Sequence, residues 1–114
     1  MGKRRLYSES LYKLLTDTSA EILRGREVAP GYVRFVTHGA VEDATTAPTT
    51  LAFGREQGGR FEALEEDDAP AAGIRSHTAK THHFLAGERP AFRVEGGTSN
   101  DVLRAFLEGY EEES

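Results

Sequence analysis

The sequence contains no cysteine and no tryptophan, and its one methionine is at position 1. The lack of cysteine excludes a disulfide scaffold, a thiolate zinc site and a cysteine nucleophile. Without tryptophan, the scattered Phe and Tyr residues indicate no stacking platform for single-stranded nucleic acid. No apolar run approaches the roughly 20 residues that cross a bilayer. With 114 residues, of which 38% are hydrophobic and 29% charged, we expect one soluble, folded domain.

The first ten residues, MGKRRLYSES, are basic, but no hydrophobic segment follows them. They therefore do not have the pattern of a signal peptide. Leu6 also stands where a myristoylation signal needs Ser or Thr. We expect no membrane association.

The net charge of −5 is unevenly distributed, because residues 1–26 carry +3 and the remainder −8, with acidic runs at 65–68 and 111–113. An acidic body repels phosphates, so we expect no direct nucleic-acid binding. We predict that Lys3, Arg4 and Arg5 belong to a basic N-terminal arm, residues 1–10, that contacts an acidic partner. The alternative is a disordered terminus beside solvated loops. The folded domain is predicted to span residues 11–114 and to survive removal of the arm.

Glycine and proline divide the chain into segments of about 5–10 residues, a spacing typical of an antiparallel sandwich or barrel. Alternation of apolar and polar residues predicts five strands inside these segments. A short hairpin loop at Gln57-Gly58-Gly59 would join the second to the third. The predicted strands are Tyr32–Thr37, Thr49–Glu56, Arg60–Leu64, Gly73–Thr78 and Ala91–Glu95.

Two segments are ambiguous. Residues 11–24 place leucines near helical spacing, but the polar stretch Thr16–Ser19 would instead suit a turn between two strands. Residues 98–110 begin with a sequence typical of a helix N-cap and carry a helical apolar stripe. The same residues also alternate as a strand would. Local periodicity by itself favours a helix for residues 98–110.

Four histidines, His38, His77, His82 and His83, are the candidate metal ligands. Their spacing matches no common zinc pattern, and neighbours on a strand point to opposite faces, so His82 and His83 would not converge on one ion. We predict no metal, no cofactor and no catalytic residue.

Other chemical motifs are also lacking. The acidic run at 65–68 has no calcium-loop spacing and is predicted to be a solvated loop. The glycines near position 58 lack the Gly-Lys-Ser/Thr ending of a phosphate-binding loop, and no Gly-x-Ser-x-Gly elbow occurs. We therefore predict a protein that is not an enzyme.

One ordering of segments is more specific than any single motif. Val28-Ala29-Pro30-Gly31 leads into a strand, and a Thr-rich connection, 43–50, leads into Leu51-Ala52-Phe53-Gly54. Leu85-Ala86-Gly87-Glu88-Arg89 introduces another strand, and Gly96–Asp101 introduces the last. This order, over about residues 28–110, resembles small accessory β-sandwich proteins of tailed-bacteriophage virions, with Leu-Ala-Gly-Glu where those proteins often have Pro-Gly-Asp/Glu.

The resemblance implies an all-β fold, a single antiparallel jelly-roll-like sandwich, and it makes Asp101–Tyr110 the last strand in place of a helix. It implies a structural role in the virion, as a head decoration, neck or tail accessory protein. The partners would be capsid, portal or tail proteins and further copies of the chain, after synthesis in the host cytoplasm. The alternative is a module that recognises a carbohydrate or host surface through its loops.

Overall fold

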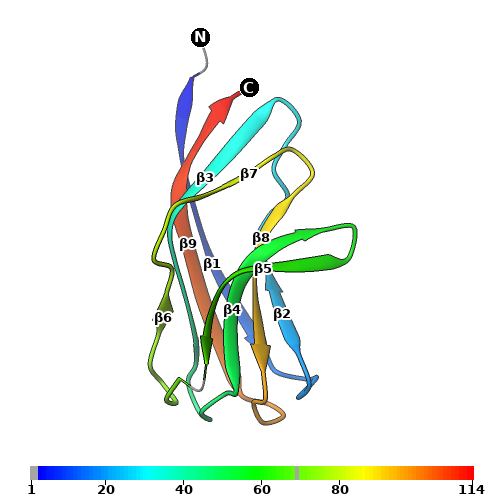
Figure 1. Cartoon of the computed structure of the whole chain (residues 1–114), viewed down its shortest axis with the longest axis vertical. Coiled ribbons are helices and arrows are strands. Elements are labelled where there is room, and N and C mark those ends of the chain that lie inside the picture. Colours follow the sequence, from blue (N-terminus) through cyan, green and yellow to red (C-terminus); the bar gives the residue numbers. More distant parts are fainter. Residues whose placement is uncertain (1–2, 69) are drawn as a thin grey trace.

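The computed structural model describes residues 3–68 and 70–114, which form two antiparallel sheets and no helix (Figure 1). The strands are β1 (Arg4–Leu14), β2 (Glu21–Arg24), β3 (Tyr32–Asp43), β4 (Thr50–Gln57), β5 (Arg60–Asp68), β6 (Ser76–His77), β7 (His82–Phe84), β8 (Arg89–Glu95) and β9 (Val102–Glu113). Sheet A has the order β1-β9-β3, and both β6 and β7 pair with β3. Sheet B has the order β2-β8-β4-β5. Within the described ranges, no helix is long and apolar enough to span a membrane.

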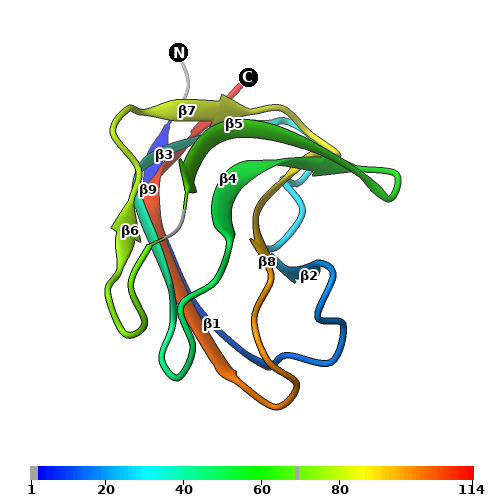
Figure 2. The ribbon, with the colours of Figure 1, turned by 60° about the horizontal axis from the view of Figure 1, so that its bottom comes forward.

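The strands pair as four nested ribbons. β1 pairs with β9, β2 with β8, β3 with β6 and β7, and β4 with β5. Each ribbon in this series is enclosed in the sequence by the one before it, which is the arrangement of a jelly roll. Figure 2 shows the two sheets as separate layers that face each other. The predicted fold class, an all-β antiparallel sandwich of jelly-roll type, is confirmed.

The core lies between the sheets and follows from strand alternation. On β9, Leu103, Ala105 and Leu107 are buried, whereas the residues between them are more exposed. Within sheet B, the Phe53 ring lies 5.2 Å from that of its cross-strand partner Phe92, and across the sandwich it meets Phe84 of β7 edge-on at 5.9 Å. Aromatic rings in these arrangements bury much apolar area and add specific attraction.

Two glycine positions explain features of the strands. Gly58 and Gly59 have φ angles of 60° and 80°, and Gln57 pairs with Arg60, so the predicted hairpin is a two-residue turn with both central residues in the left-handed region. Gly109 lies inside β9, where a Cβ would come within 1.8 Å of the Phe35 carbonyl oxygen. The close approach accompanies a register shift in β3 after Val36.

Residues 11–24 form the turn between strands that the polar stretch favoured, and the helical spacing of the leucines is not realised. The Glu21 carboxylate organises this turn. It accepts hydrogen bonds from the Thr16 amide at 2.7 Å and the Thr16 hydroxyl at 2.8 Å, and it pairs with the Lys13 ammonium at 2.9 Å. Burial by itself would raise the pKa of Glu21, but these donors outweigh it and lower the pKa to about 2.

We expect Glu21→Gln to lower the free energy of unfolding by about 2 kcal/mol at pH 7, because charge-assisted hydrogen bonds are replaced by weaker ones. The folded-state pKa lies below the unfolded value, so this stabilisation is present above pH 4.5 and is lost as the pH falls toward about 2. Urea unfolding of the wild type and of Glu21→Gln between pH 7 and pH 2.5 measures this difference in stability. A difference in stability that stayed constant over this range would contradict the expectation.

The structure differs from three expectations that were drawn from the sequence. Residues 102–113 form β9, as the resemblance implied, and not the helix that local periodicity favoured. The acidic run at 65–68 is the second half of β5 and not a loop. The boundary drawn after residue 10 falls within β1, since residues 4–10 pair continuously with β9.

Candidate functional site

The outer face of sheet A carries three neighbouring rows of side chains, each running across paired strands. Tyr12, Arg104 and Glu42 form the first row. The second row contains Ser10, Phe106, Ala40 and His77, and the third contains Ser8, Glu108 and His38. Because paired residues point to the same side of a sheet, the rows place aromatic rings between charged and hydroxyl groups.

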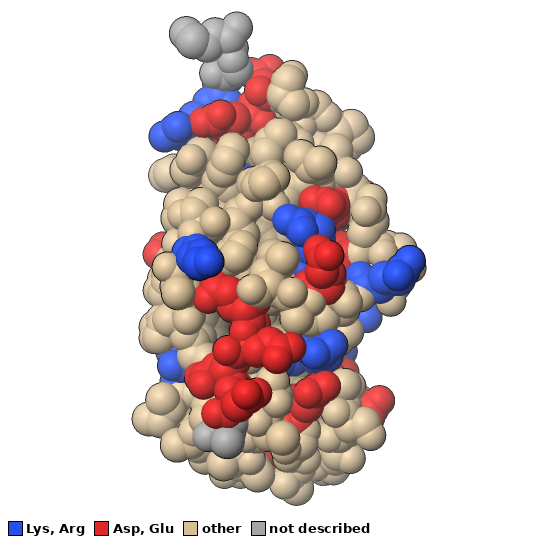
Figure 3. Space-filling view, in the orientation of Figure 1, with Lys and Arg blue, Asp and Glu red and all other residues tan. Residues whose placement is uncertain are grey.

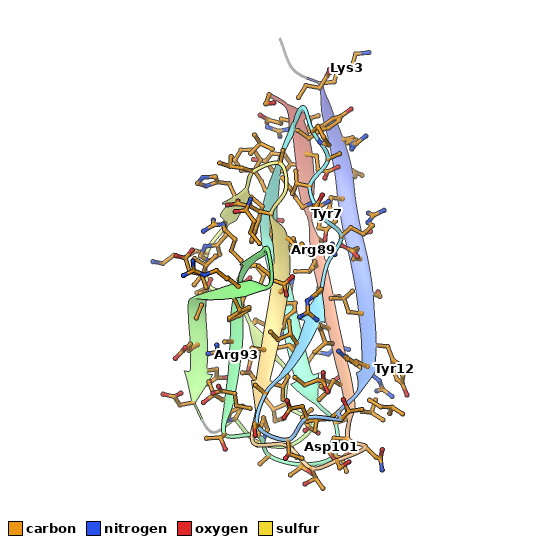
Figure 4. The ribbon with its side chains drawn as sticks, turned by 90° about the vertical axis from the view of Figure 1, so that its right-hand side faces the viewer. Lys3, Tyr7, Tyr12, Arg89, Arg93 and Asp101 are labelled. Carbon is orange, nitrogen blue, oxygen red and sulfur yellow. The ribbon has the colours of Figure 1, made fainter. Side chains whose placement is uncertain are left out.

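A shallow groove of about 470 Å³ crosses these rows. Its volume is within the range of about 300–1,000 Å³ that is typical of ligand sites. Tyr12 at its margin is 66% exposed, and Figure 4 shows its side chain projecting from β1 away from the sandwich. Arg75, from the segment before β6, forms another wall. The lining residues are 8–12 of β1, Ala40, Arg75 and 104–108 of β9.

Contacts between neighbouring side chains hold the groove in shape. The Arg75 guanidinium lies 5.6 Å from the Phe106 ring centroid and donates from Nε to the Glu42 carboxylate at 3.3 Å. The His38 ring meets Phe106 edge-on at 5.1 Å, and its Nδ1 lies 3.3 Å from the Glu108 carboxylate. Planar groups held from several sides offer fixed hydrogen-bonding directions to a ligand.

β1 has an open edge. The Leu15 amide donates to the Asp101 carbonyl and the Glu113 amide to the Lys3 carbonyl, so the odd-numbered residues of β1 bond to β9. The even-numbered residues, Leu6 and Ser8 among them, then direct their N–H and C=O groups away from β9. Among the described strands, β1 pairs only with β9. Leu6, at this edge, is 92% exposed.

The three basic residues predicted to bind a partner lie at the start of this strand, beside the acidic end of β9. Arg4 pairs with Glu112 and Arg5 with Glu111, each at 2.8 Å. The Lys3 amide donates to the Glu113 carboxylate at 3.1 Å. Arg4 and Arg5 side chains remain 62% and 52% exposed. That these residues contact a partner stays a prediction.

The four histidines fall into separate settings. His38 Nε2 lies 2.8 Å from His77 Nδ1, and the two rings are parallel. His82 Nε2 contacts the Glu65 carboxylate at 2.5 Å, while the His83 ring lies on the other side of β7, near Phe35. Within residues 3–68 and 70–114, no cluster of three or more His, Asp or Glu residues could hold a metal ion.

The acidic side chains of β5 gather over one face of the molecule (Figure 3), where they link the edges of the two sheets. Glu65 accepts from the Ala79 amide at 2.7 Å as well as from His82, and Asp67 accepts from the Ser76 hydroxyl at 2.5 Å. Burial would raise the pKa of Glu65, but the Ala79 amide and His82 lower it. This acidic run therefore has a structural use.

Two buried carboxyl groups, Asp43 and Asp101, meet where β3 and β9 approach the same end of the sandwich. Asp43 is 1% exposed and accepts from the Thr45 and Thr46 amides at 3.0 Å, and Asp101 accepts from the Thr98 amide at 2.9 Å. Burial and the neighbouring Asp101 raise the pKa of Asp43. Nothing in the sequence indicated this pair, because 58 positions separate its members.

Comparison with known proteins identifies no family. No family model matches the sequence, and no curated protein matches it. Among solved structures, one described as the crystal structure of PirA superposes with a TM-score of 0.51 at 10% identity, covering 89% of this chain and 93% of that one. This likeness shows a shared fold.

Two further structures are similar over most of this chain. One is described as "CBM4 structure and function", with a TM-score of 0.39, 15% identity and coverage of 91% of this chain and 84% of that one. The other is a chain from infectious bursal disease virus, Gx strain, with a TM-score of 0.44, 8% identity and coverage of 96% and 32%.

Proposed function

We propose that the chain is a non-catalytic structural component of a bacteriophage virion, as a head decoration, neck or tail accessory protein, that assembles in symmetric copies beside capsid, portal or tail proteins. The open edge of β1 carries this proposal. An edge strand of 11 residues with unpaired backbone groups is a template for pairing with another chain, and proteins that remain monomeric usually protect such edges.

Side chains along β1 add to the support. Leu6 and Leu14, near the two ends of β1, are 92% and 44% exposed, which places exposed apolar side chains along the open edge. Burial of such side chains between copies would stabilise an assembly. Arg4 and Arg5 already pair with β9 carboxylates. We therefore assign the main contact to Leu6 and Leu14 of β1 and a secondary one to Lys3, Arg4 and Arg5.

Recognition of a partner through the loops has less support. All ten Phe and Tyr residues belong to strands. The loops that join the strands therefore lack the aromatic rings that commonly anchor recognition sites.

The double variant Leu6→Lys/Leu14→Lys should disrupt self-association, since it places charges along the edge without touching the core. The matched control is Ile74→Lys/Leu85→Lys, which changes two loop residues that are 58% and 52% exposed. Light scattering after size exclusion should give oligomers for the wild type and the control, and monomers for the β1 variant. Mass spectrometry of bacteriophage particles purified from the host bacterium should detect the protein. Its absence from particles, or a wild type monomeric at about millimolar concentration, would contradict the proposal.

A further inference from the structure

The groove on sheet A has a ring at its floor and little bulk beside it. Phe106 stands in the middle row between Ser10 of β1 and Ala40 of β3, two of the smallest side chains in that face. Arg75 and His38 contact the ring, but the small neighbours in its own row leave it partly exposed to a flat ligand lying along that row. Tyr12, one row away on β1, provides a second and more exposed ring.

Polar groups border these rings on both sides. Arg104 pairs in register with Tyr12, and Arg75 forms the wall beyond Ala40. Glu108 and Ser8 occupy the row on the opposite side of Phe106. The border therefore offers guanidinium donors, a carboxylate acceptor and hydroxyl groups within one site.

The charges in the groove balance. Arg75 is neutralised by Glu42, and Glu108 stands opposite Arg104 across Phe106. A polyanion would meet the Glu108 carboxylate, and a polycation would meet two guanidinium groups. An uncharged ligand that has an apolar face and several hydroxyl groups satisfies all of these groups.

We propose that the groove binds a neutral oligosaccharide of pyranose units. The C–H face of a pyranose ring would lie against Phe106 and Tyr12, and its hydroxyl groups would bond to Arg104, Arg75, Glu108 and the serines. The groove is open at the surface, so a longer saccharide chain can continue past it. This inference goes beyond the proposed role in assembly, because the groove lies on the face of sheet A and not at the edge of β1.

Isothermal titration calorimetry tests the proposal with five neutral hexasaccharides: cellohexaose, xylohexaose, maltohexaose, mannohexaose and chitohexaose. Hexagalacturonate serves as the acidic comparison. We expect at least one neutral compound to bind with a Kd below about 1 mM, because one or two ring contacts and a few hydrogen bonds give modest affinity. No binding by the neutral compounds at about 5 mM, or binding of hexagalacturonate alone, would overturn the proposal.

Variants then locate the site. Tyr12→Ala should weaken binding about tenfold, and Arg104→Gln should weaken it by a similar factor. Tyr110→Ala is the matched control, because it removes an outward-facing ring from β9 that does not line the groove. Its affinity should stay within about twofold of the wild type. If Tyr12→Ala and Arg104→Gln both bind the oligosaccharide as tightly as the wild type, the proposed site is wrong. If these variants lose oligosaccharide binding but still form normal oligomers, the assembly proposal is unaffected.

Discussion

Replacement of Arg34 by Met should lower the free energy of unfolding by about 3 kcal/mol, because it leaves the Glu111 carboxylate buried with a weaker set of partners. The Arg34 and Glu111 side chains are 3% and 7% exposed and lie 2.9 Å apart. Arg34 also donates to the Arg26 carbonyl at 2.5 Å and lies over the Tyr7 ring at 4.0 Å. One guanidinium group therefore joins β1, β3, β9 and the segment before β3.

The matched control is Arg4→Met. Arg4 pairs with Glu112 at 2.8 Å, but these side chains are 62% and 37% exposed, so the pair contributes less than about 1 kcal/mol. Chemical denaturation at pH 7 compares the two variants. The double variant Arg34→Met/Glu111→Gln should recover part of the loss, because no charge is left buried. Equal losses for Arg4→Met and Arg34→Met would show that burial does not decide the strength of these pairs.

At acidic pH, Arg34→Met should lower the free energy of unfolding by less than it does at pH 7. Burial would raise the pKa of Glu111, but Arg5 and Arg34 together lower it below its usual value. A group with a lowered folded-state pKa stabilises the protein above its unfolded pKa, near 4.5, and loses that contribution as the pH falls further. The difference in the free energy of unfolding between the wild type and Arg34→Met should therefore become smaller below about pH 4.

Deletion of residues 1–10 should unfold the protein, which reverses the expectation from the sequence alone. Tyr7 is 4% exposed, and its pKa is raised by burial and by the hydrogen bond that its phenol donates to the Glu9 carboxylate at 2.5 Å. The deletion removes this side chain from the core and exposes one edge of β9 along more than half its length. Loss of one core aromatic costs about 3–5 kcal/mol, a large part of the stability of a small domain.

A control variant tests whether folding requires the strand β1 itself or the particular residues at its outward-facing positions. The variant Leu6→Thr/Ser8→Thr/Ser10→Thr changes only outward-facing positions of β1 and keeps strand-favouring residues there. It should remain folded, with a cooperative thermal transition by circular dichroism, while the deletion should show none. A deletion variant with a Tm within a few degrees of the wild type would mean that residues 4–10 are dispensable.

The fold class could be predicted from the sequence because the spacing of glycine and proline and the alternation of apolar and polar residues both indicate short strands in the middle of the chain. β9 was harder, since sheet A carries apolar residues on both faces. Val102 and Phe106 on its outer face and Leu103 and Leu107 on its inner face together imitate a helical stripe. The acidic half of β5 lacked alternation for a different reason, because the Glu65 carboxylate bonds to Ala79 before β7 and to His82 at the start of β7.

The candidate site depends on register, which a single sequence does not reveal. The groove brings Tyr12, Arg75 and Phe106 together from three parts of the chain. Each looks ordinary in the sequence, and only the pairing of β1 with β9 places the first beside the third. Serines alternate with larger residues in β1, but residues 1–10 were predicted to be a basic arm and no strand was expected there. The sequence therefore gave no hint of a groove.

The outermost ribbon of the jelly roll joins the two ends of the chain, since Arg4 pairs with Glu112. During translation at about 5–20 residues per second, β1 is therefore made roughly 5–20 s before its partner exists. Tyr7 and the apolar edge of β1 stay uncovered throughout that interval. Native-like sheet A can form only once β9 has left the ribosome, so folding of this domain is expected to begin late and to be slow for its size.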